Sequence, residues 1–194
     1  MARSKEFEPP EALAAALELF RRRGYEATSM ADLVEHLGIG RASIYATFGS
    51  KRELYLRALD QYIGETDAHI IARLSRPGPA LPAVRDLIDW YAEEATADDP
   101  DRRGCLVVSA AVELLPGDEQ VARRVEASWR TLEVALATAL SRARAEGDLR
   151  AGADPRGLAR LLVVVLQGFR VTGAGADPER IRDAARQAIG ILEA

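Results

Sequence analysis

Residues 28–51 read TSMADLVEHLGIGRASIYATFGSK, and this stretch decides the fold. Its first half carries apolar residues at the i, i+3, i+4, i+7 spacing of one helix face: Met30, Leu33, Val34 and Leu37. Ser29 and Asp32 form a capping pattern before that face, and Gly38 follows it, where a left-handed C-cap favours glycine. The pattern predicts a short capped helix that ends in a glycine turn.

A second short helix follows at once. Ile44 and Phe48 lie four residues apart and form an inward face, whereas the outward residues are small or polar. Gly49 then breaks the chain, and Ser50 with Glu53 gives a second capping box. Two short helices joined by a glycine-containing turn are the helix-turn-helix pattern. A plain helical hairpin with a solvated polar face is the alternative that spacing alone leaves open.

The charge of the second helix and its flanks indicates what the motif binds. From residue 39 to residue 57, four basic residues face a single acidic one: Arg41, Lys51, Arg52 and Arg57 against Glu53. Small side chains let a helix approach a groove, while Arg and Ser donate to base edges or phosphates. The pattern favours a helix that binds nucleic acid.

This stretch and its flanking helices resemble the DNA-binding domain of the TetR/AcrR family of transcriptional regulators. Four patterns carry the resemblance: Ala16-Leu17-x-Leu19-Phe20-x-x-x-Gly24-Tyr25, Thr28-Ser29-Met30-x-Asp32-Leu33, Leu37-Gly38-Ile39 and Ser43-Ile44-Tyr45-x-x-Phe48-x-Ser50-Lys51-x-x-Leu54. Gly40 and Ala42 depart from it, because many members carry Ser at the first position and Pro or another side chain at the second.

The resemblance implies that the motif docks on double-stranded DNA. Lys51, Tyr45 and the start of the first motif helix, at Thr28 and Ser29, would hold phosphates. The residues implied to face bases are Arg41, Ala42, Ser43 and Thr47, with Ala46 on the same outward side. A homodimer would place its two recognition helices about 34 Å apart, so the expected target is an inverted repeat.

Composition indicates a folded chain. Its single cysteine, Cys105, cannot form an internal disulfide, which suits a reducing compartment. Of 194 residues, 48% are hydrophobic and 29% are charged, an ordinary globular balance. The net charge of −4 argues against a generally basic coat but allows a local basic patch. The apolar run 161–166 is far shorter than the roughly 18 residues of a membrane span. With no apolar leader either, we expect a cytoplasmic protein without membrane partners.

The remainder of the chain predicts helices and few strands. A long helix from Lys51 to about Leu74 ends at residues 75–82, where three prolines and a glycine break it. These patterns predict an all-α fold, and the resemblance implies that it is of TetR type. Its N-terminal helix-turn-helix DNA-binding domain occupies residues 1–50, and a helical ligand-binding and dimerisation domain occupies residues 51–194.

The resemblance also implies that the last two helices form a four-helix bundle with a second copy. The residues expected in this dimer interface are Leu158, Leu161, Leu162, Val165, Phe169, Ile181, Ala185, Ala188, Ile189 and Leu192. A monomer with these apolar faces uncovered would expose a large patch. The alternative is that they form the core of a single chain.

A small-molecule effector is the second partner that the resemblance implies. The candidate pocket residues are Trp90, Cys105, Val108, Trp129, Leu132, Leu166 and Phe169. No cluster of charges accompanies them, so we expect a mostly apolar effector; each is equally suited to a core position. Arg102 and Arg103 precede Cys105 at a predicted helix start, which favours a reactive thiolate, while an inert buried thiol is the alternative.

No residue pattern indicates an enzyme. The glycines lack the partners of a phosphate-binding loop, and His36 and His69 have no acidic, His or Cys cluster at metal-ligand spacing. We predict no catalytic residue, no metal and no cofactor. The resemblance implies a repressor that a small-molecule effector releases from its operator. Three alternatives stay open: an activator or co-repressor-dependent regulator of the same family, a helical ligand-binding protein without DNA function, and an enzyme whose site assembles only in three dimensions.

Overall fold

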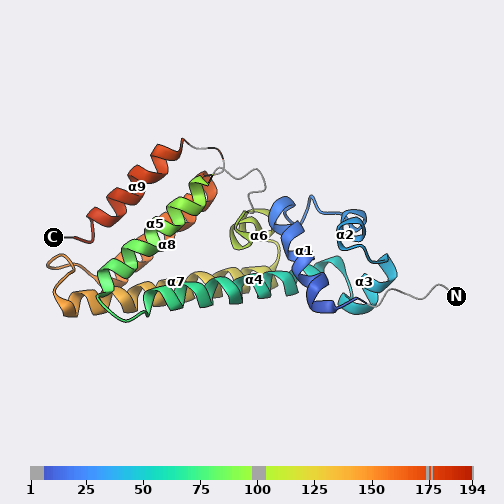
Figure 1. Cartoon of the computed structure of the whole chain (residues 1–194), viewed down its shortest axis with the longest axis horizontal. Helices are drawn as coiled ribbons and strands as arrows, with labels where there is room; N and C mark the ends of the chain where they lie inside the picture. Colours follow the sequence, from blue (N-terminus) through green and yellow to red (C-terminus); the bar gives the residue numbers. More distant parts are fainter. Residues whose placement is uncertain (1–6, 98–103, 174, 176, 194) are drawn as a thin grey trace. The chain divides into compact units, whose positions relative to one another are not determined.

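The structure is a computed structural model, which describes residues 7–97, 104–173, 175 and 177–193. Within these residues the chain forms α-helices joined by turns, with no β-strand (Figure 1). The helices are, in chain order, α1 (Pro9–Arg23), α2 (Met30–Leu37), α3 (Arg41–Phe48), α4 (Lys51–Leu74), α5 (Ala80–Thr96), α6 (Leu106–Leu114), α7 (Glu119–Glu146), α8 (Pro155–Thr172) and α9 (Pro178–Gly190). The expected all-α fold is confirmed.

The helix starts follow the capping chemistry of the sequence. Ser29 caps α2 in a capping box, and Asp154 and Asp177 accept backbone N–H bonds at the starts of α8 and α9. α5 differs from the expectation, because it begins at Ala80, inside the predicted break. Pro82 lies in its first turn, where a missing N–H removes no intrahelical hydrogen bond.

Packing divides the chain into two compact units. The first contains the described residues up to 64 and those of 104–125, which form α1, α2, α3, α6 and the N-terminal parts of α4 and α7. Aromatic rings cluster inside it, with the Tyr55 centroid 5.0 Å from that of Phe20 and 4.8 Å from that of Tyr25. α6 packs on α1 (Figure 1), so a segment remote in sequence belongs to the helix-turn-helix unit.

The second unit contains the described residues of 65–97 and 126–193. α5 packs on both α8 and α9, and the three helices lie side by side in Figure 1. Tyr91 of α5 is buried in its core, with the Arg170 guanidinium 4.3 Å from the ring centroid. No helix in the described part of the chain is both long and apolar enough to cross a bilayer.

These two units are defined by packing alone. α4 and α7 contribute to both, since the boundary falls at residue 64 in α4 and at residue 125 in α7. The expected functional division, with DNA binding in residues 1–50 and ligand binding and dimerisation in residues 51–194, stays a prediction.

Candidate nucleic-acid interface

The N-terminus of α2 presents backbone donors. Ser29 Oγ accepts from the Asp32 N–H at 3.1 Å, and Asp32 Oδ2 accepts from the Ser29 N–H at 2.8 Å. Met30 and Ala31 lie between them in the first turn, where N–H groups have no intrahelical acceptor. A helix N-terminus of this kind, with its partial positive charge, is suited to a phosphate group.

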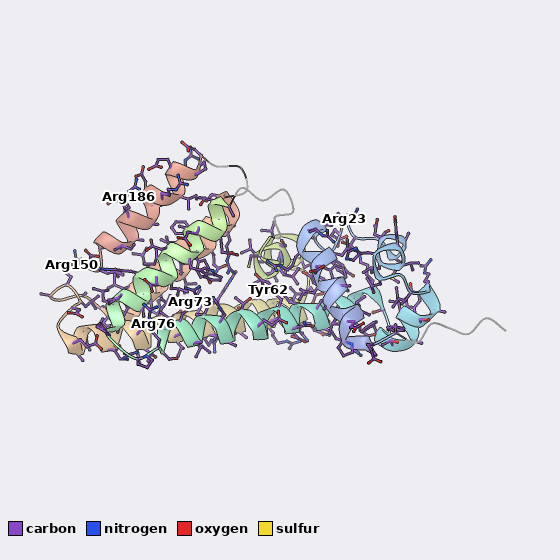
Figure 2. All side chains as sticks on the ribbon, in the orientation of Figure 1. Arg23, Tyr62, Arg73, Arg76, Arg150 and Arg186 are labelled. Carbon is purple, nitrogen blue, oxygen red and sulfur yellow. The ribbon has the colours of Figure 1, made fainter. Side chains whose placement is uncertain are left out.

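Asp32 is an unusually acidic carboxyl in this cap. Hydrogen bonds from the Ser29 hydroxyl at 2.5 Å and the Ser29 N–H, and then from the Arg23 guanidinium at 2.7 Å, lower the pKa of Asp32 to about 2. Arg23 reaches it from the C-terminal end of α1, where Figure 2 labels it. The carboxylate is therefore ionised throughout the physiological range, and the cap is intact there.

α3 presents a polar outward face over an apolar inward one. Ile44 and Phe48 are buried, as the spacing predicted. Four of the residues implied to contact DNA are exposed: Arg41, Ala42, Tyr45 and Ala46. Ser43 and Thr47, which were expected to face bases, are half-buried on the flanks of the helix. Of the residues expected to face bases, Arg41 and Ala42 are therefore the more exposed ones, and the contact of all four with DNA stays a prediction.

Arg41 and Tyr45 form a linked pair on this face. The Arg41 guanidinium donates to the Tyr45 hydroxyl at 3.3 Å and lies 5.6 Å from the centroid of its ring. A guanidinium held in this way presents its remaining donors in a fixed direction. Arg is the side chain that most often reads guanine, through paired hydrogen bonds in the major groove.

Two residues implied to hold phosphates are engaged inside the protein. Lys51 Nζ donates to the carbonyl oxygens of Tyr25 at 2.7 Å and Thr28 at 2.6 Å, and lies 4.1 Å from the centroid of the Tyr25 ring. The Thr28 hydroxyl is buried and donates to the Gly24 carbonyl at 2.6 Å. Both side chains fix the loop between α1 and α2. Their contact with DNA stays a prediction.

Arg52 is also neutralised within the first unit. It pairs with Asp118, at 2.7 Å from Nη2 to Oδ2, and Asp118 accepts the Gln120 and Val121 N–H groups at the start of α7. Burial alone would raise the pKa of Asp118, but the Val121 N–H and the Arg52 guanidinium bring it below its ordinary value. The basic excess counted along the sequence is therefore smaller on the surface.

Sequence reasoning missed the contribution of α6 to this unit. Glu113 Oε2 accepts the Tyr25 N–H at 2.8 Å and the Glu26 N–H at 2.9 Å. Arg21 Nε donates to the Gly104 carbonyl at 3.2 Å. No local pattern could have indicated these contacts, because the partners lie more than 80 positions apart in the chain.

The predicted effector residues are divided between the two units. Cys105 and Val108 lie at the start of α6 in the first unit. The other five lie in the second: Trp90, Trp129, Leu132, Leu166 and Phe169. Of these, Leu132, Leu166 and Phe169 are buried in one hydrophobic core, and Trp90 packs against it. Their role as ligand contacts stays a prediction.

Cys105 is half-buried at the N-cap of α6, with no capping hydrogen bond from its side chain. Arg102 and Arg103, on which the argument for a reactive thiolate rested, lie outside the described residues. Within the described part of the chain, no group of three His, Cys, Asp or Glu side chains is arranged to hold a metal ion.

Most residues expected in the dimer interface already have partners within the chain. Six of the ten are buried in the second unit: Leu162, Phe169, Ile181, Ala185, Ala188 and Leu192. Leu158, Val165 and Ile189 are partly buried against the same core, and Leu161 is 45% exposed. The choice of interface residues stays a prediction, but the single-chain core is the role that the structure gives to most of them.

A capped helix, a glycine turn and a second helix with an exposed polar face define a DNA-binding helix-turn-helix protein. A family model described as "Bacterial regulatory proteins, tetR family" matches residues 12–58, and one described as "Tetracyclin repressor-like, C-terminal domain" matches residues 80–189. The chain belongs to the TetR family of transcriptional regulators.

Similar proteins agree with this assignment. The uncharacterised HTH-type transcriptional regulator YezE of Bacillus subtilis (strain 168) is 36% identical over 197 residues, covering 100% of each chain. The HTH-type transcriptional repressor ComR of Escherichia coli (strain K12) is 31% identical over 184 residues, 92% of this chain and 86% of ComR. A cysteine mutant of the TetR family regulator CifR, complexed with 26-bp operator DNA, matches at 31% identity with a TM-score of 0.83, covering 98% of this chain and 100% of CifR.

Proposed function

We propose that this protein is a non-enzymatic, ligand-responsive transcriptional repressor that binds an inverted-repeat operator in the cytoplasm as a homodimer. The exposed face of α3 is the observation that carries this proposal. Arg41 and Tyr45 point outward together, while Ile44 and Phe48 anchor the helix from behind. A helix that is small and polar outside and apolar inside is suited to the major groove.

The docking mode combines this helix with the start of α2. Arg41 contacts base edges, and the Met30 and Ala31 N–H groups receive a phosphate. CifR, whose structure contains operator DNA, and ComR, which is named as a repressor, support DNA binding and repression by similarity. Release by an effector is the function of the helical second unit.

An apolar seam on α8 supports the homodimer. Its members are spaced alternately by four and three residues along the helix: Gly157, Leu161, Val164, Gly168 and Val171. This is the spacing of helices that pack lengthwise, and the glycines allow a close approach. Val164 is 71% exposed and Val171 is 55% exposed, so a partner helix would cover both.

Two buried polar atoms in the second unit support an effector with hydrogen-bonding groups. Trp129 Nε1 and Gln167 Oε1 have no hydrogen-bond partner among the described residues. An unpaired buried polar atom costs about 1–3 kcal/mol. A ligand that offers an acceptor to Trp129 and a donor to Gln167 would recover that cost. We therefore infer a mostly apolar effector that also carries hydrogen-bonding groups.

Selection of genomic DNA by the purified protein tests the proposal. At near-physiological salt, we expect enrichment of fragments that share one inverted repeat, and footprinting should protect both half-sites. A reporter placed behind that repeat should be less active when the protein is present. Absence of enrichment would contradict DNA binding by the free protein, and an increase in reporter activity would contradict repression.

A further inference from the structure

The loop between α1 and α2 depends on a side chain from α6. Gly24 ends α1 with a φ of +79°, and the N–H groups of the next two residues, Tyr25 and Glu26, bind a side chain of α6. One oxygen of Glu113, Oε2, accepts both of them, at 2.8 and 2.9 Å. A carboxylate that accepts two backbone N–H groups forms charge-assisted hydrogen bonds, which are about twice as strong as neutral ones.

Gly24 makes this approach possible. A Cβ at this position would lie 2.1 Å from Glu113 Oε1, well inside the contact distance of the two atoms. Its positive φ also favours glycine. Backbone conformation and space therefore both favour a residue without a side chain where the Glu113 carboxylate meets the loop.

The same loop is held from its other side by the opposite charge. Lys51 donates to the carbonyl oxygens of Tyr25 and Thr28, so the Tyr25 backbone binds Glu113 through its N–H and Lys51 through its carbonyl. Ser29, the N-cap of α2, comes directly after Thr28. The path of this loop consequently determines where the N-terminus of α2 lies.

α6 is also fixed at both of its ends, to α1 before it and to α4 after it. Before it, the Gly104 N–H donates to the Arg21 carbonyl at 3.1 Å, and Arg21 Nε donates back to the Gly104 carbonyl at 3.2 Å. After it, Asp118 pairs with Arg52. Glu113 lies between these two attachments, in a segment that the C-terminal family model covers.

We propose that Glu113 is a positioning residue for DNA binding, the clamp through which α6 holds the α1–α2 loop and the N-terminus of α2 in the shape that receives a phosphate. The inference rests on the proposed docking of α2 and α3. α6 continues through a short turn into α7, which extends into the second unit. A displacement of α6 would therefore reach the α1–α2 loop by two routes. One is direct, through the hydrogen bonds of Glu113, and the other is through α4, to which Asp118 is bound by Arg52.

Glu113→Ala in the full-length protein tests this clamp. The probe is a DNA duplex that the wild-type protein selects from a random-sequence library. We expect Glu113→Ala to bind this duplex at least tenfold more weakly. Glu113→Gln, whose amide oxygen can accept the same two N–H groups, should stay within about threefold of the wild type. Glu126→Ala, which removes a carboxylate from an exposed ion pair on α7, is the matched control and should bind normally.

Hydrogen exchange in the DNA-free protein separates positioning from general stability. In Glu113→Ala the Tyr25 and Glu26 amides and the first turn of α2 should lose protection, while the amides of α3 and of the α4 core keep it. Loss of protection throughout the first unit would show that Glu113 only stabilises the fold, and would overturn the proposal.

Gly24→Ala supplies a second variant, because its methyl group expels the Glu113 carboxylate. Its effect on DNA affinity should be smaller in the Glu113→Ala background than in the wild type, since the clamp is then already absent. Additive effects, or wild-type affinity of Glu113→Ala, would overturn the clamp. Failure of the wild-type protein to select any duplex would instead refute the proposed DNA binding, and the positioning role with it.

Discussion

Lys51 combines a positive charge, three donors and a half-buried position at the start of α4. Two of its donors bind the Tyr25 and Thr28 carbonyl oxygens, and its ammonium group faces the Tyr25 ring. Hydrogen bonds from a charged group contribute more than neutral ones, and the unpaired carbonyls left by its removal would be costly. At the residue scale, Lys51 is therefore a structural support of the α1–α2 loop.

Lys51→Ala should destabilise the protein by about 2 kcal/mol in urea unfolding, because the loop loses two charge-assisted hydrogen bonds. If Lys51 serves only this loop, removing it eliminates no direct phosphate contact of its own, and the slope of log affinity for DNA against log salt should fall by less than 1. Arg57→Ala removes an exposed cation from the same helix, which makes only a 3.5 Å hydrogen bond to the Thr47 carbonyl and a ring contact with Phe48, and it should destabilise by about half as much or less. A salt slope smaller by about 1, with unchanged stability, would place Lys51 on a phosphate instead.

Asp32 gives a second prediction at this scale. Because its pKa is about 2 in the folded protein and 3.8 ordinarily, its contribution to stability is complete above pH 3.8 and is lost as the pH falls towards 2. Ser29→Ala should raise the pKa of Asp32 towards 3.8, as followed by NMR titration of the carboxyl carbon. Ser50→Ala, which alters the cap of α4, should leave it at about 2; an unchanged pKa in Ser29→Ala would contradict the assigned cause.

The site residues show what local patterns can and cannot predict. The capping box of Ser29 and the inward face of α3 were predictable, because both depend on residues three or four positions apart. The environments of Thr28 and Lys51 were not, since the hydrogen bonds that engage them depend on how the loop folds. The pattern selected these positions without indicating whether each side chain faces DNA or protein.

At the scale of the elements, the turn between α2 and α3 contains two glycines with different requirements. Gly38 has a φ of +66°, the left-handed region, whereas Gly40 is the N-cap of α3 with a φ of −66° and no side-chain cap. A Cβ at either position would meet no atom within 4 Å. Backbone conformation, and not space, therefore decides the effect of a substitution at each.

Gly40→Ser and Gly38→Ser should shift stability in opposite directions. Serine at position 40 can cap α3 and should stabilise by a few tenths of a kcal/mol, about the difference between these two residues as N-caps. Serine at position 38 must adopt a left-handed conformation and should destabilise by about 1 kcal/mol. Thermal unfolding of both variants beside the wild type measures this, and a shift of the same sign in both would contradict it.

The elements themselves were largely predictable, whereas their assembly was not. Prolines, glycines and Asp N-caps mark most helix ends, because helix termination is local chemistry. The place of α6 beside α1 has no such mark: Glu113 lies 88 positions from Tyr25, and the sequence gives no reason to pair them. For the same reason, the ten apolar residues expected at the dimer interface could not be separated from the core by periodicity.

At the scale of the whole molecule, the α8 seam is the surface through which the proposed homodimer would bring two helix-turn-helix units together. A single helix-turn-helix unit makes few phosphate and base contacts. A dimer binds two half-sites at once, so its affinity for the whole operator is much higher than that of one unit for one half-site. Val164, at the centre of the seam, is exposed in the single chain. The exposed side of α9 instead carries ion pairs, such as that of Arg186, labelled in Figure 2, with Glu179.

Val164→Arg should therefore convert the proposed dimer into a folded monomer. Val164 is 71% exposed, so the arginine should cost the single chain little, but a partner helix could cover its charge only at a large desolvation cost. Sedimentation at micromolar concentration should show the halved mass, with unchanged helical circular dichroism and at least tenfold weaker operator binding. Val112→Arg, at a 73% exposed position on α6, is the control and should remain dimeric. If Val164→Arg sediments as the wild type does, the dimer interface does not lie on this face of α8. Another surface would then set the distance between the two helix-turn-helix units.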